Sequence, residues 1–376
     1  YASNGTYYFK KGLYVKKYFE ELVKKDIHIK GEYYVSLVFN LLVRDRFKVS
    51  IYKIQHMLQW GTPQDVIEYK SWSKYFTNII NNKNISSVKR DSFTLIPLAG
   101  RGSRFSKLGY KDPKPLIEVS GKPMIIQAAN SLPKTQSIIF VTLREHLENY
   151  YLKNILKDEF QDAKVISLDQ VTKGQAITCS LGLKNLDDNS SLLIAATDNG
   201  MIFDQKKYLQ LIDDEKVDAI IFTFRNHFSS KINPHMYGWV KTDGNNRAIN
   251  VSVKVPISKN PYDDHAIVGT FWFKKIKYFN EGLRSMIQKD IRINDEFYVD
   301  SVMDELIKLG LNVKVFEIND YICWGTPNDY ETFKYWQSYF HKAKSHPYRI
   351  EQDPTVNKNK ISELENSFNN FGQEHR

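Results

Sequence analysis

Short apolar runs alternate with amphipathic stretches in the middle of the chain. Four runs end in, or are directly followed by, a small or polar residue: "SFTLIPLAG" (92–100), "SIIFVTL" (137–143), "SLLIAATD" (191–198) and "AIIFTF" (219–224). Such near-continuous apolar runs are typical of parallel strands that are buried on both faces. The stretches "PMIIQAANSL" and "QAITCSLGLKNL" between them have the spacing of helices. The alternation predicts an α/β fold with a mixed, mostly parallel sheet flanked by helices.

A second pattern is an internal repeat. The corner "CWGTPNDY" (323–330) matches "QWGTPQDV" (59–66) at an offset of 264 residues. In the same register "KDIHIKGEYYV" (25–35) lies on "KDIRINDEFYV" (289–299), and 27 of 76 aligned pairs are identical. Chance similarity does not hold a register over that length. We therefore expect residues 1–76 to be a partial copy of 265–340, the C-terminal half of a domain spanning 91–344.

The flanking segments are polar. Residues 77–90, "TNIINNKNISSVKR", are rich in Asn, Ser and Lys and predict a linker. Residues 345–376 contain few apolar side chains and predict a disordered tail with at most one weak helix. We expect the partial copy to carry strands and helices like those of 265–340. It would lean on the complete domain, pair with another chain, or be the remnant of a longer protein.

The composition narrows the class of protein. The 376 residues carry a net charge of +10, but the 13 Lys and Arg of the first 76 residues are scattered, which favours a solvated surface over nucleic-acid binding. No run of about eighteen apolar residues occurs, so no membrane insertion is predicted. Cys179 and Cys323 lack metal-ligand spacing. They predict free thiols and a cytoplasmic location.

A glycine-rich loop with two cations follows the first apolar run, in "LAGRGSRFSKLGYKDPKPLIEVSGKPM" (98–124). Gly100 and Gly102 allow a tight turn in which backbone N–H groups approach a phosphate. Arg104 and Lys114 belong to the same loop, and prolines fix the backbone on both sides of Lys114. Such cations stabilise the charge that builds when a triphosphate loses pyrophosphate. The loop fits neither the Walker pattern nor the dinucleotide-binding pattern.

The stretch from about residue 94 to 340 resembles the sugar-1-phosphate nucleotidyltransferases. Its nearest likeness is to the nucleotidyltransferase-like proteins of bacterial capsule and surface-polysaccharide loci. The resemblance is carried by "LAGRGSRF", "PKPL", "GKPM", "TKGQA", "TDNG", "GTFWF", "DEFYV" and "WGTP". It implies a Rossmann-like, GT-A-like fold, Mg²⁺ or Mn²⁺, and two substrates, an NTP and a sugar 1-phosphate or similar phosphorylated alcohol. The products are an NDP-sugar and pyrophosphate, and no protein nucleophile is needed.

The resemblance also implies roles for individual residues. Arg104 and Lys114 would be catalytic and bind the triphosphate and the departing pyrophosphate. Asp198 would bind the metal, which agrees with the usual place of ligands at the carboxyl ends of parallel strands. The other residues would bind the nucleotide (Leu98, Ala99, Gly100, Gly102, Gly174 and Gln175) or the sugar phosphate (Lys254, Gly269, Thr270 and Glu296).

The chain departs from the family pattern at Cys323. Many members have an aspartate there as the second metal ligand, and a thiol is a poor ligand for Mg²⁺. Metal binding would rest on Asp198, phosphates and water, with Asp320 or Asp329 as substitutes if the geometry allows.

Two other functions stay open. The first is a GT-A glycosyltransferase, although Asp-Asn-Gly at 198–200 offers one acid where that class has Asp-x-Asp. The second is a non-catalytic protein of the same fold. The base, the sugar and any homo-oligomer are not determined by the sequence.

Overall fold

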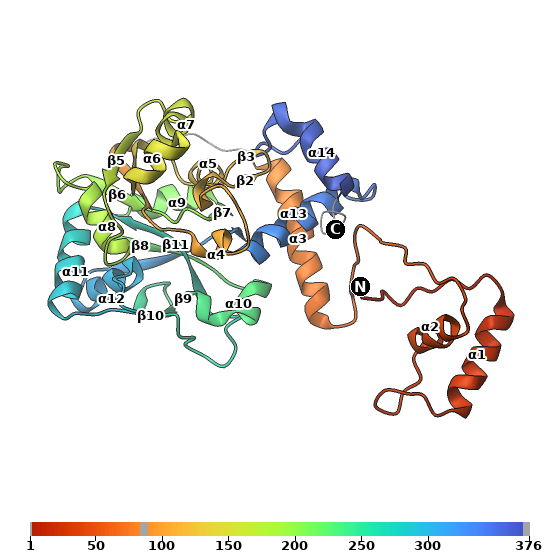
Figure 1. The fold of residues 1–376 in the computed structure, drawn as a ribbon. Coiled ribbons are helices and arrows are strands. Elements are labelled where there is room, and N and C mark those ends of the chain that lie inside the picture. The colour runs from red at the N-terminus through yellow and green to blue at the C-terminus, as the bar shows by residue number, and fades with distance from the viewer. Residues whose placement is uncertain (1, 83–88, 371–376) are drawn as a thin grey trace. The chain divides into compact units, whose positions relative to one another are not determined.

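The computed structural model describes residues 2–82 and 89–370. The chain divides into two compact units, Tyr1–Gln59 with Asn369–Arg376, and Trp60–Phe368. Figure 1 shows the elements of both units, and each unit is described by itself.

A nine-stranded mixed sheet forms the centre of the larger unit. Its main path runs β10-β9-β11-β6-β1-β4-β5, with β8 between β11 and β12. Pairing is parallel through β6, β1, β4 and β5 and between β8 and β12, and antiparallel around β11. The strands are β1 (Lys89–Leu98), β4 (Thr135–Leu143), β5 (Lys164–Leu168), β6 (Ser191–Ile194), β8 (Ala219–Phe224), β9 (Gly238–Thr242), β10 (Ala248–Val253), β11 (His265–Phe273) and β12 (Val313–Glu317).

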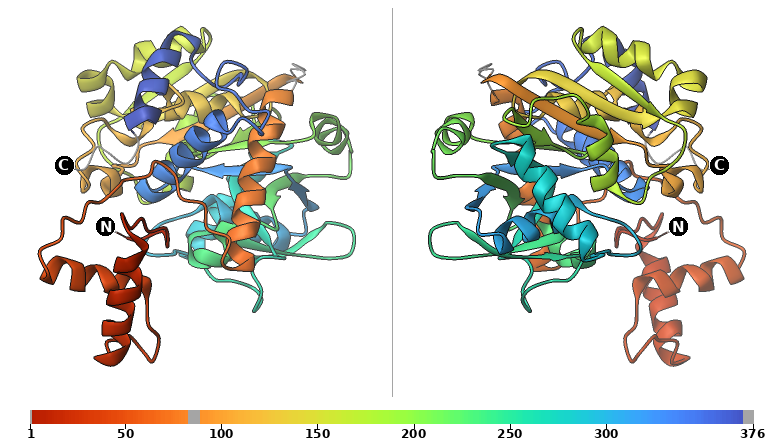
Figure 2. Two further views of the ribbon diagram at one scale, coloured as in Figure 1. Left: turned by 90° about the vertical axis from the view of Figure 1, so that its right-hand side faces the viewer. Right: turned by 90° about the vertical axis from the view of Figure 1, so that its left-hand side faces the viewer.

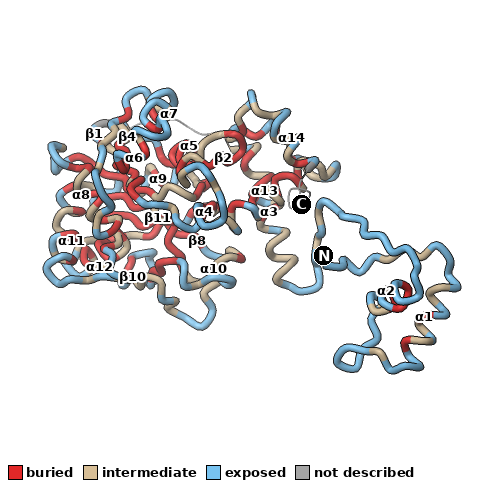
Figure 3. Tube along the Cα trace, in the orientation of Figure 1, coloured by how far each residue is buried: buried red, intermediate tan, exposed pale blue. Residues whose placement is uncertain are grey.

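Helices cover both faces of this sheet (Figures 1 and 2). On β1 the side chain of Leu95 packs into one core and that of Ile96 into the other, because successive strand residues point to opposite faces. The first core includes α8 (Gln175–Gly182), α11 (Ile276–Gln288) and α12 (Val299–Lys308), and the second includes α5 (Met124–Asn130), α7 (Leu152–Glu159) and α9 (Gln205–Ile212). Figure 3 shows the buried residues concentrated on the strands. The predicted α/β class with a largely parallel central sheet is confirmed.

Shorter elements complete the larger unit. Two small sheets pair β2 (Glu118–Val119) with β3 (Lys122–Pro123) and β7 (Asn199–Ile202) with β13 (Asp320–Cys323). The remaining elements are α3 (Pro63–Asn81), α4 (Ser103–Ser106), η1 (Lys114–Leu116), α6 (Arg144–Tyr150), α10 (Phe228–Ile232), η2 (Pro234–Met236), α13 (Pro327–Lys342), η3 (Lys358–Lys360) and α14 (Ile361–Asn370).

The smaller unit is a helical hairpin of α1 (Gly12–Lys24) and α2 (Val35–Arg44). Adding 264 to the bounds of α1 and α2 gives the bounds of α11 and α12. Residues 2–10 and 48–59 align with β11, β12 and β13 but form no strands, so the expectation of strands in this copy was wrong. Helix hydrogen bonds are local, whereas a strand needs a neighbouring strand, and residues 2–59 offer none.

The domain boundaries differ from those expected. The division falls between Gln59 and Trp60, so α3 belongs to the larger unit rather than to a separate 1–76 segment. The expected linker 77–90 begins inside α3 and ends inside β1. Its centre, 83–88, lies outside the described residues.

The expectation of a disordered tail was wrong for residues 345–370. Tyr348, Ile350, Val356 and Phe368 are at most 2% exposed, and α14 closes the segment. These few apolar side chains are enough to pack the segment against the larger unit. The low apolar content of the stretch therefore does not imply disorder. A buried network fixes the same segment, because Gln337 donates to the Tyr348 hydroxyl, which donates to Asp353.

Candidate active site

The glycine-rich loop leads from β1 to a partly buried lysine, Lys114. Leu98 and Ala99 are buried at the end of β1, and Gly100 is exposed where the loop begins. Gly102 has φ +60°, and a Cβ there would lie 2.8 Å from Cβ of Lys114. Glycine therefore allows the loop to fold closely over Lys114.

Lys114 forms an ion pair with Asp198. The Lys114 ammonium also donates to the carbonyl oxygen of Gly325 at 3.0 Å. The two charged side chains are 17% and 29% exposed, so the pair is only partly shielded from water. Three segments that are distant in the sequence meet here: the phosphate-type loop, the turn between β6 and β7, and the corner after β13.

The Trp-Gly corner holds the Asp198 segment in place. The backbone N–H of Trp324 donates to the backbone oxygen of Asp198 at 2.8 Å. Strand β13 pairs with β7 so that Cys323 lies opposite Asn199. A Cβ on Gly200 would lie 2.8 Å from the Trp324 ring. A Cβ on Gly325 would lie 3.2 Å from the Asp198 carboxylate. The Trp324 ring thus packs against Gly200, and the backbone at Gly325 lies close to the Asp198 carboxylate.

The Thr-Pro part of the corner starts α13. Thr326 and Asp329 form a capping box, and Pro327 occupies the first turn. Asp329 Oδ2 accepts bonds from Thr326 N and Oγ1 at 3.1 and 2.6 Å. Thr62 and Asp65 form the same box at the start of α3. The repeated Thr-Pro motif therefore specifies a helix start in both copies.

Cys323 is a neutral thiol in this site. Burial raises its pKa, and the nearby Asp329 and Asp198 carboxylates add to the shift. Its Sγ lies 3.7 Å from Asp329 Oδ2 and accepts from the Gly325 N–H at 3.3 Å. A protonated thiol is not a ligand for a hard cation.

Both acids considered as substitute metal ligands are engaged elsewhere. Asp320 is 7% exposed and binds two side chains of α3, Lys74 at 3.2 Å and Asn78 at 2.7 Å. Asp329 is used in the capping box. Asp198 is the carboxylate that the structure presents beside the loop.

Arg104 lies apart from this ion pair. Its side chain is exposed on α4 and has no ion-pair partner within 2–82 and 89–370. The next residue, Phe105, is buried, and the Lys114 ammonium lies 5.7 Å from its ring centroid. The loop therefore brings Arg104 and Lys114 to one region without joining them.

The "TKGQA" turn packs against the "DEFYV" segment. Gly174 has φ +122°, and a Cβ there would lie 2.4 Å from the backbone nitrogen of Phe297. Backbone bonds of 3.0 Å join Phe297 to Lys173 and Ala176. This pairing brings Gln175, which is partly exposed, into the neighbourhood of Glu296, which is exposed.

Lys254 belongs to a second polar cluster. It has φ +59°, and its ammonium donates to the Tyr298 hydroxyl at 2.7 Å. Asp300 lies nearby, and burial raises its pKa to about 6 while Lys254 opposes the shift. A Cβ on Gly238 would lie 2.2 Å from Asp300 Oδ1. Sequence reasoning missed Tyr298 and Asp300, and the available signal was their place two and four residues after Glu296.

Tyr237 lies between the two clusters. Its carbonyl oxygen accepts from the Lys254 N–H at 3.0 Å. Its pKa is raised chiefly by burial, and the negative charges of Asp329 and Asp198 add to the shift. The Lys254 and Asp198 clusters therefore border the same tyrosine.

Gly269 lies close to the Asp198 turn, but Thr270 points away from solvent. Gly269 has φ +88°, and a Cβ there would lie 3.1 Å from Cβ of Ala196. Thr270 is 0% exposed, and its hydroxyl has no hydrogen-bond partner in the described part of the chain. The structure brings Gly269 to the site and leaves Thr270 in the interior.

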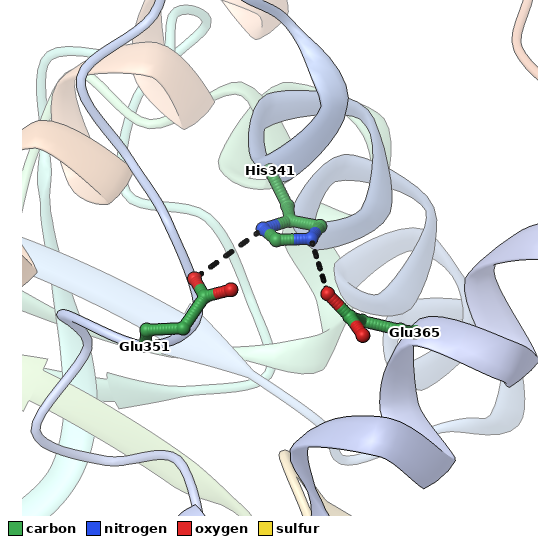
Figure 4. Close-up of side chains that lie close together, drawn as sticks. All are labelled: His341, Glu351 and Glu365. Carbon is green, nitrogen blue, oxygen red and sulfur yellow. Dashed lines mark ion pairs between the residues drawn. The ribbon is translucent and has the colours of Figure 1, made fainter.

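A separate cluster of His341, Glu351 and Glu365 could be mistaken for a metal centre (Figure 4). Nδ1 of His341 lies 4.0 Å from Glu351, and Nε2 lies 3.8 Å from Glu365. The carboxylates face different ring nitrogens, so their oxygens do not converge with one ring nitrogen on a common point, and burial lowers the pKa of His341. His341 also lies about 21 Å along α13 from the corner, at 1.5 Å per residue, away from Asp198.

The fold defines an α/β protein in which the loop after β1 and the turn after β6 meet at the carboxyl ends of parallel strands, where such folds usually bind their ligands. The profile of the Nucleotidyl transferase family matches residues 94–303. This is more than half of the chain, and the chain belongs to that family. It is a nucleotidyltransferase enzyme.

The chain is similar to a bifunctional protein GlmU of Methanococcus aeolicus, at 25% identity over 232 residues. That similarity covers 60% of this chain and 49% of the relative, so the chain spans about half the relative's length.

Three solved structures share the fold. A nucleoside-diphosphate-sugar pyrophosphorylase of Vibrio cholerae has a TM-score of 0.52 and 22% identity, covering 64% of this chain and 98% of its own. An inositol-1-phosphate CTP transferase of T. maritima has a TM-score of 0.50 and 14% identity, covering 65% and 96%. A putative glucose-1-phosphate thymidylyltransferase of Bacillus anthracis has a TM-score of 0.50 and 18% identity, covering 64% and 93%.

Among the described residues, no helix is both long and apolar enough to cross a membrane.

Proposed function

We propose that the protein transfers a nucleotidyl group from an NTP to a sugar 1-phosphate, or to a similar phosphorylated alcohol. One observation carries this proposal: Lys114 of the glycine-rich loop meets Asp198 and the Gly325 carbonyl at one point. A phosphate-binding cation beside a strand-end carboxylate is the arrangement that a triphosphate with a divalent cation requires.

The reaction balances without a protein nucleophile. A phosphate oxygen of the sugar phosphate attacks the α-phosphorus of the NTP. The bond from the α-phosphorus to the bridging oxygen breaks, and pyrophosphate leaves with that oxygen. The Lys114 ammonium, now paired with Asp198, would turn to the phosphates and stabilise the charge on the departing pyrophosphate. Arg104 is exposed and free to reach the same triphosphate.

Mg²⁺ or Mn²⁺ would be held by Asp198. The carboxylate is a hard oxygen ligand, and the neutral Cys323 thiol beside it is not. Phosphate oxygens and water would supply the other ligands, and the cation would neutralise phosphate charge. Because one protein carboxylate holds it, we expect the metal to bind weakly until the nucleotide arrives.

The acceptor would bind on the Lys254 side of Tyr237. Lys254 is the cation of that cluster, and Glu296 lies exposed beside "TKGQA". The names of the three similar structures include a nucleoside-diphosphate-sugar, an inositol 1-phosphate and a glucose 1-phosphate enzyme. They support a phosphorylated polyol or sugar as the acceptor. A role in capsule or other surface-polysaccharide synthesis follows from the resemblance of the sequence.

The test is pyrophosphate release. The protein is incubated with Mg²⁺, each NTP and a panel of sugar 1-phosphates and inositol 1-phosphate. Release that needs both substrates, and that falls in Arg104→Ala and Lys114→Ala, is the expected result. Lys107→Ala is the matched control, because Lys107 is an exposed cation at the end of α4.

Two results would contradict the proposal. Transfer of sugar from an NDP-sugar without pyrophosphate indicates a glycosyltransferase. Nucleotide binding with neither reaction indicates a non-catalytic protein of this fold.

A further inference from the structure

Helices α3 and α13 pack against each other through residues that correspond in the repeat. The repeat offset of 264 places Trp72 on Trp336 and Phe76 on Phe340. Trp72 stacks on Trp336 at 6.5 Å between ring centroids and 21° between planes. Phe76 lies 5.5 Å from Phe340. Each of these aromatic residues therefore contacts its own counterpart.

The other contacts occur in exchanged pairs. Tyr69 corresponds to Phe333. Tyr69 lies 5.6 Å from Phe340, and Phe76 lies 5.9 Å from Phe333, so the same contact is made twice with the roles reversed. Two more contacts are exchanged in the same way. Tyr69–Trp336 at 5.9 Å corresponds to Trp72–Phe333 at 6.3 Å. Tyr69–Tyr339 at 6.3 Å corresponds to Tyr75–Phe333 at 6.4 Å.

This pattern defines the symmetry of the interface. When residue i contacts residue j and j returns the contact to i, the two surfaces are related by a two-fold axis. Trp72 and Phe76 lie one turn apart on α3, and each contacts its own counterpart, so the two-fold axis lies close to both residues. The local axis passes beside the Trp72–Trp336 stack. A helix packed at random on α13 would not produce two self-contacts and three exchanged pairs of contacts.

We propose that the aromatic face of α13 is a two-fold self-association surface of this nucleotidyltransferase unit. The face consists of Phe333, Trp336, Tyr339 and Phe340. In this chain α3 occupies it in place of α13 from a second copy. The proposed binding partner of this face is the same face of α13 in a second copy of the chain.

The chemistry of the two faces supports this assignment. Trp72, Tyr75 and Phe76 are identical to their counterparts on α13, and Tyr69 differs from Phe333 by one hydroxyl. A second α13 therefore presents nearly the same atoms that α3 presents now.

The interface is also well buried. Phe76 and Phe340 are 0% exposed, Trp72 is 4% and Trp336 is 8% exposed. Aromatic side chains bury about 150–250 Å² each, which makes them strong anchors of an interface. It follows that α3 blocks association through α13 in the intact chain.

The test removes α3 from the face in the full chain. Trp72→Glu with Phe76→Glu places two charges against Trp336 and Phe340, and the charges should release α3. Light scattering should then give about twice the chain mass of 44.0 kDa, in a concentration-dependent manner. Adding Trp336→Glu should return the protein to a monomer. Lys70→Glu is the control, because Lys70 is exposed on α3 and its variant should remain a monomer.

Two results would overturn the proposal. One is a folded double variant that stays monomeric at all concentrations. The other is association that persists after Trp336→Glu. If circular dichroism shows that the double variant is unfolded, Trp72→Ala decides instead. Its thermal midpoint should rise with protein concentration if α13 faces pair, and a midpoint independent of concentration contradicts the proposal.

Discussion

Lys114 and Asp198 form an ion pair although 84 positions separate them in the chain. The pair joins the glycine-rich loop to the turn between β6 and β7, and the Gly325 carbonyl accepts from the same ammonium at 3.0 Å. In this partly buried site the two charges neutralise each other, and under the proposed function a triphosphate would take the place of Asp198 beside Lys114 and a cation that of Lys114 beside Asp198. We therefore interpret the Lys114–Asp198 ion pair as the substrate-free state of the proposed centre.

Replacing Lys114 should abolish most activity. Lys114→Met removes the cation and keeps the apolar stem, so pyrophosphate release should fall on the order of 10²–10³-fold, as for the loss of one charge-stabilising donor. The measurement is kcat at saturating NTP. Lys107→Met should stay near the wild-type rate, and an equal fall in both variants would contradict a specific role for Lys114.

Cys323→Asp should create a second carboxylate beside Asp198. Without metal the new charge lies near Asp198 and Asp329, so like-charge repulsion should lower the thermal midpoint. Mg²⁺ should raise the midpoint of the variant more than that of the wild type, because two carboxylates now share it. Thermal unfolding with and without Mg²⁺ measures both effects. An equal Mg²⁺ shift in the two proteins would show that position 323 does not face the metal.

Gly174→Ala should destabilise the larger unit. The new Cβ would lie 2.4 Å from the Phe297 nitrogen at a φ of +122°. Both the clash and the left-handed backbone act against the folded state, and we expect a loss on the order of 2–4 kcal/mol. Gly244→Ala is the control, because a Cβ there meets nothing within 4 Å. Denaturant unfolding compares the two, and similar values would refute the close packing of the turn.

Asp300 should give the stability a pH dependence. Its pKa is raised from 3.8 to about 6 in the folded state, so the folded state holds a proton that the unfolded state has released between these values. The contribution of Asp300 is therefore full below about pH 4 and is lost as the pH rises through 6. Asp300→Asn should flatten the unfolding free energy over this window. Denaturant titrations from pH 4 to 7 test this, and parallel profiles for variant and wild type would count against it.

Phe368→Ala should show that the C-terminal segment is part of the larger unit. Phe368 is 1% exposed, and removing a buried aromatic side chain costs about 3–5 kcal/mol. Thermal unfolding should show a clearly lower midpoint. Glu363→Ala, in the first turn of the same helix, controls for helix propensity. An unchanged thermal midpoint for Phe368→Ala would support the original expectation that this segment is disordered.

Features that depend on neighbouring residues could be predicted from the sequence. The apolar run at 92–100 predicted a buried strand, and β1 occupies Lys89–Leu98. Gly102 was expected to form a tight turn, and it has a positive φ. The offset of 264 predicted corresponding helices, and α1 and α2 match α11 and α12 at both ends. Helix and turn preferences are local, so a window of sequence contains them.

The tertiary structure alone decided which of these parts meet. The strands expected in residues 2–59 did not form, because a strand is stable only beside another strand. The sequence offered Asp320 as a candidate metal ligand. In the structure its carboxylate instead binds Lys74 and Asn78 of α3. The repeated Trp-Gly-Thr-Pro corner specified two helix starts by itself. Only packing placed one corner against Asp198 and Lys114, because contacts between distant segments depend on the whole core.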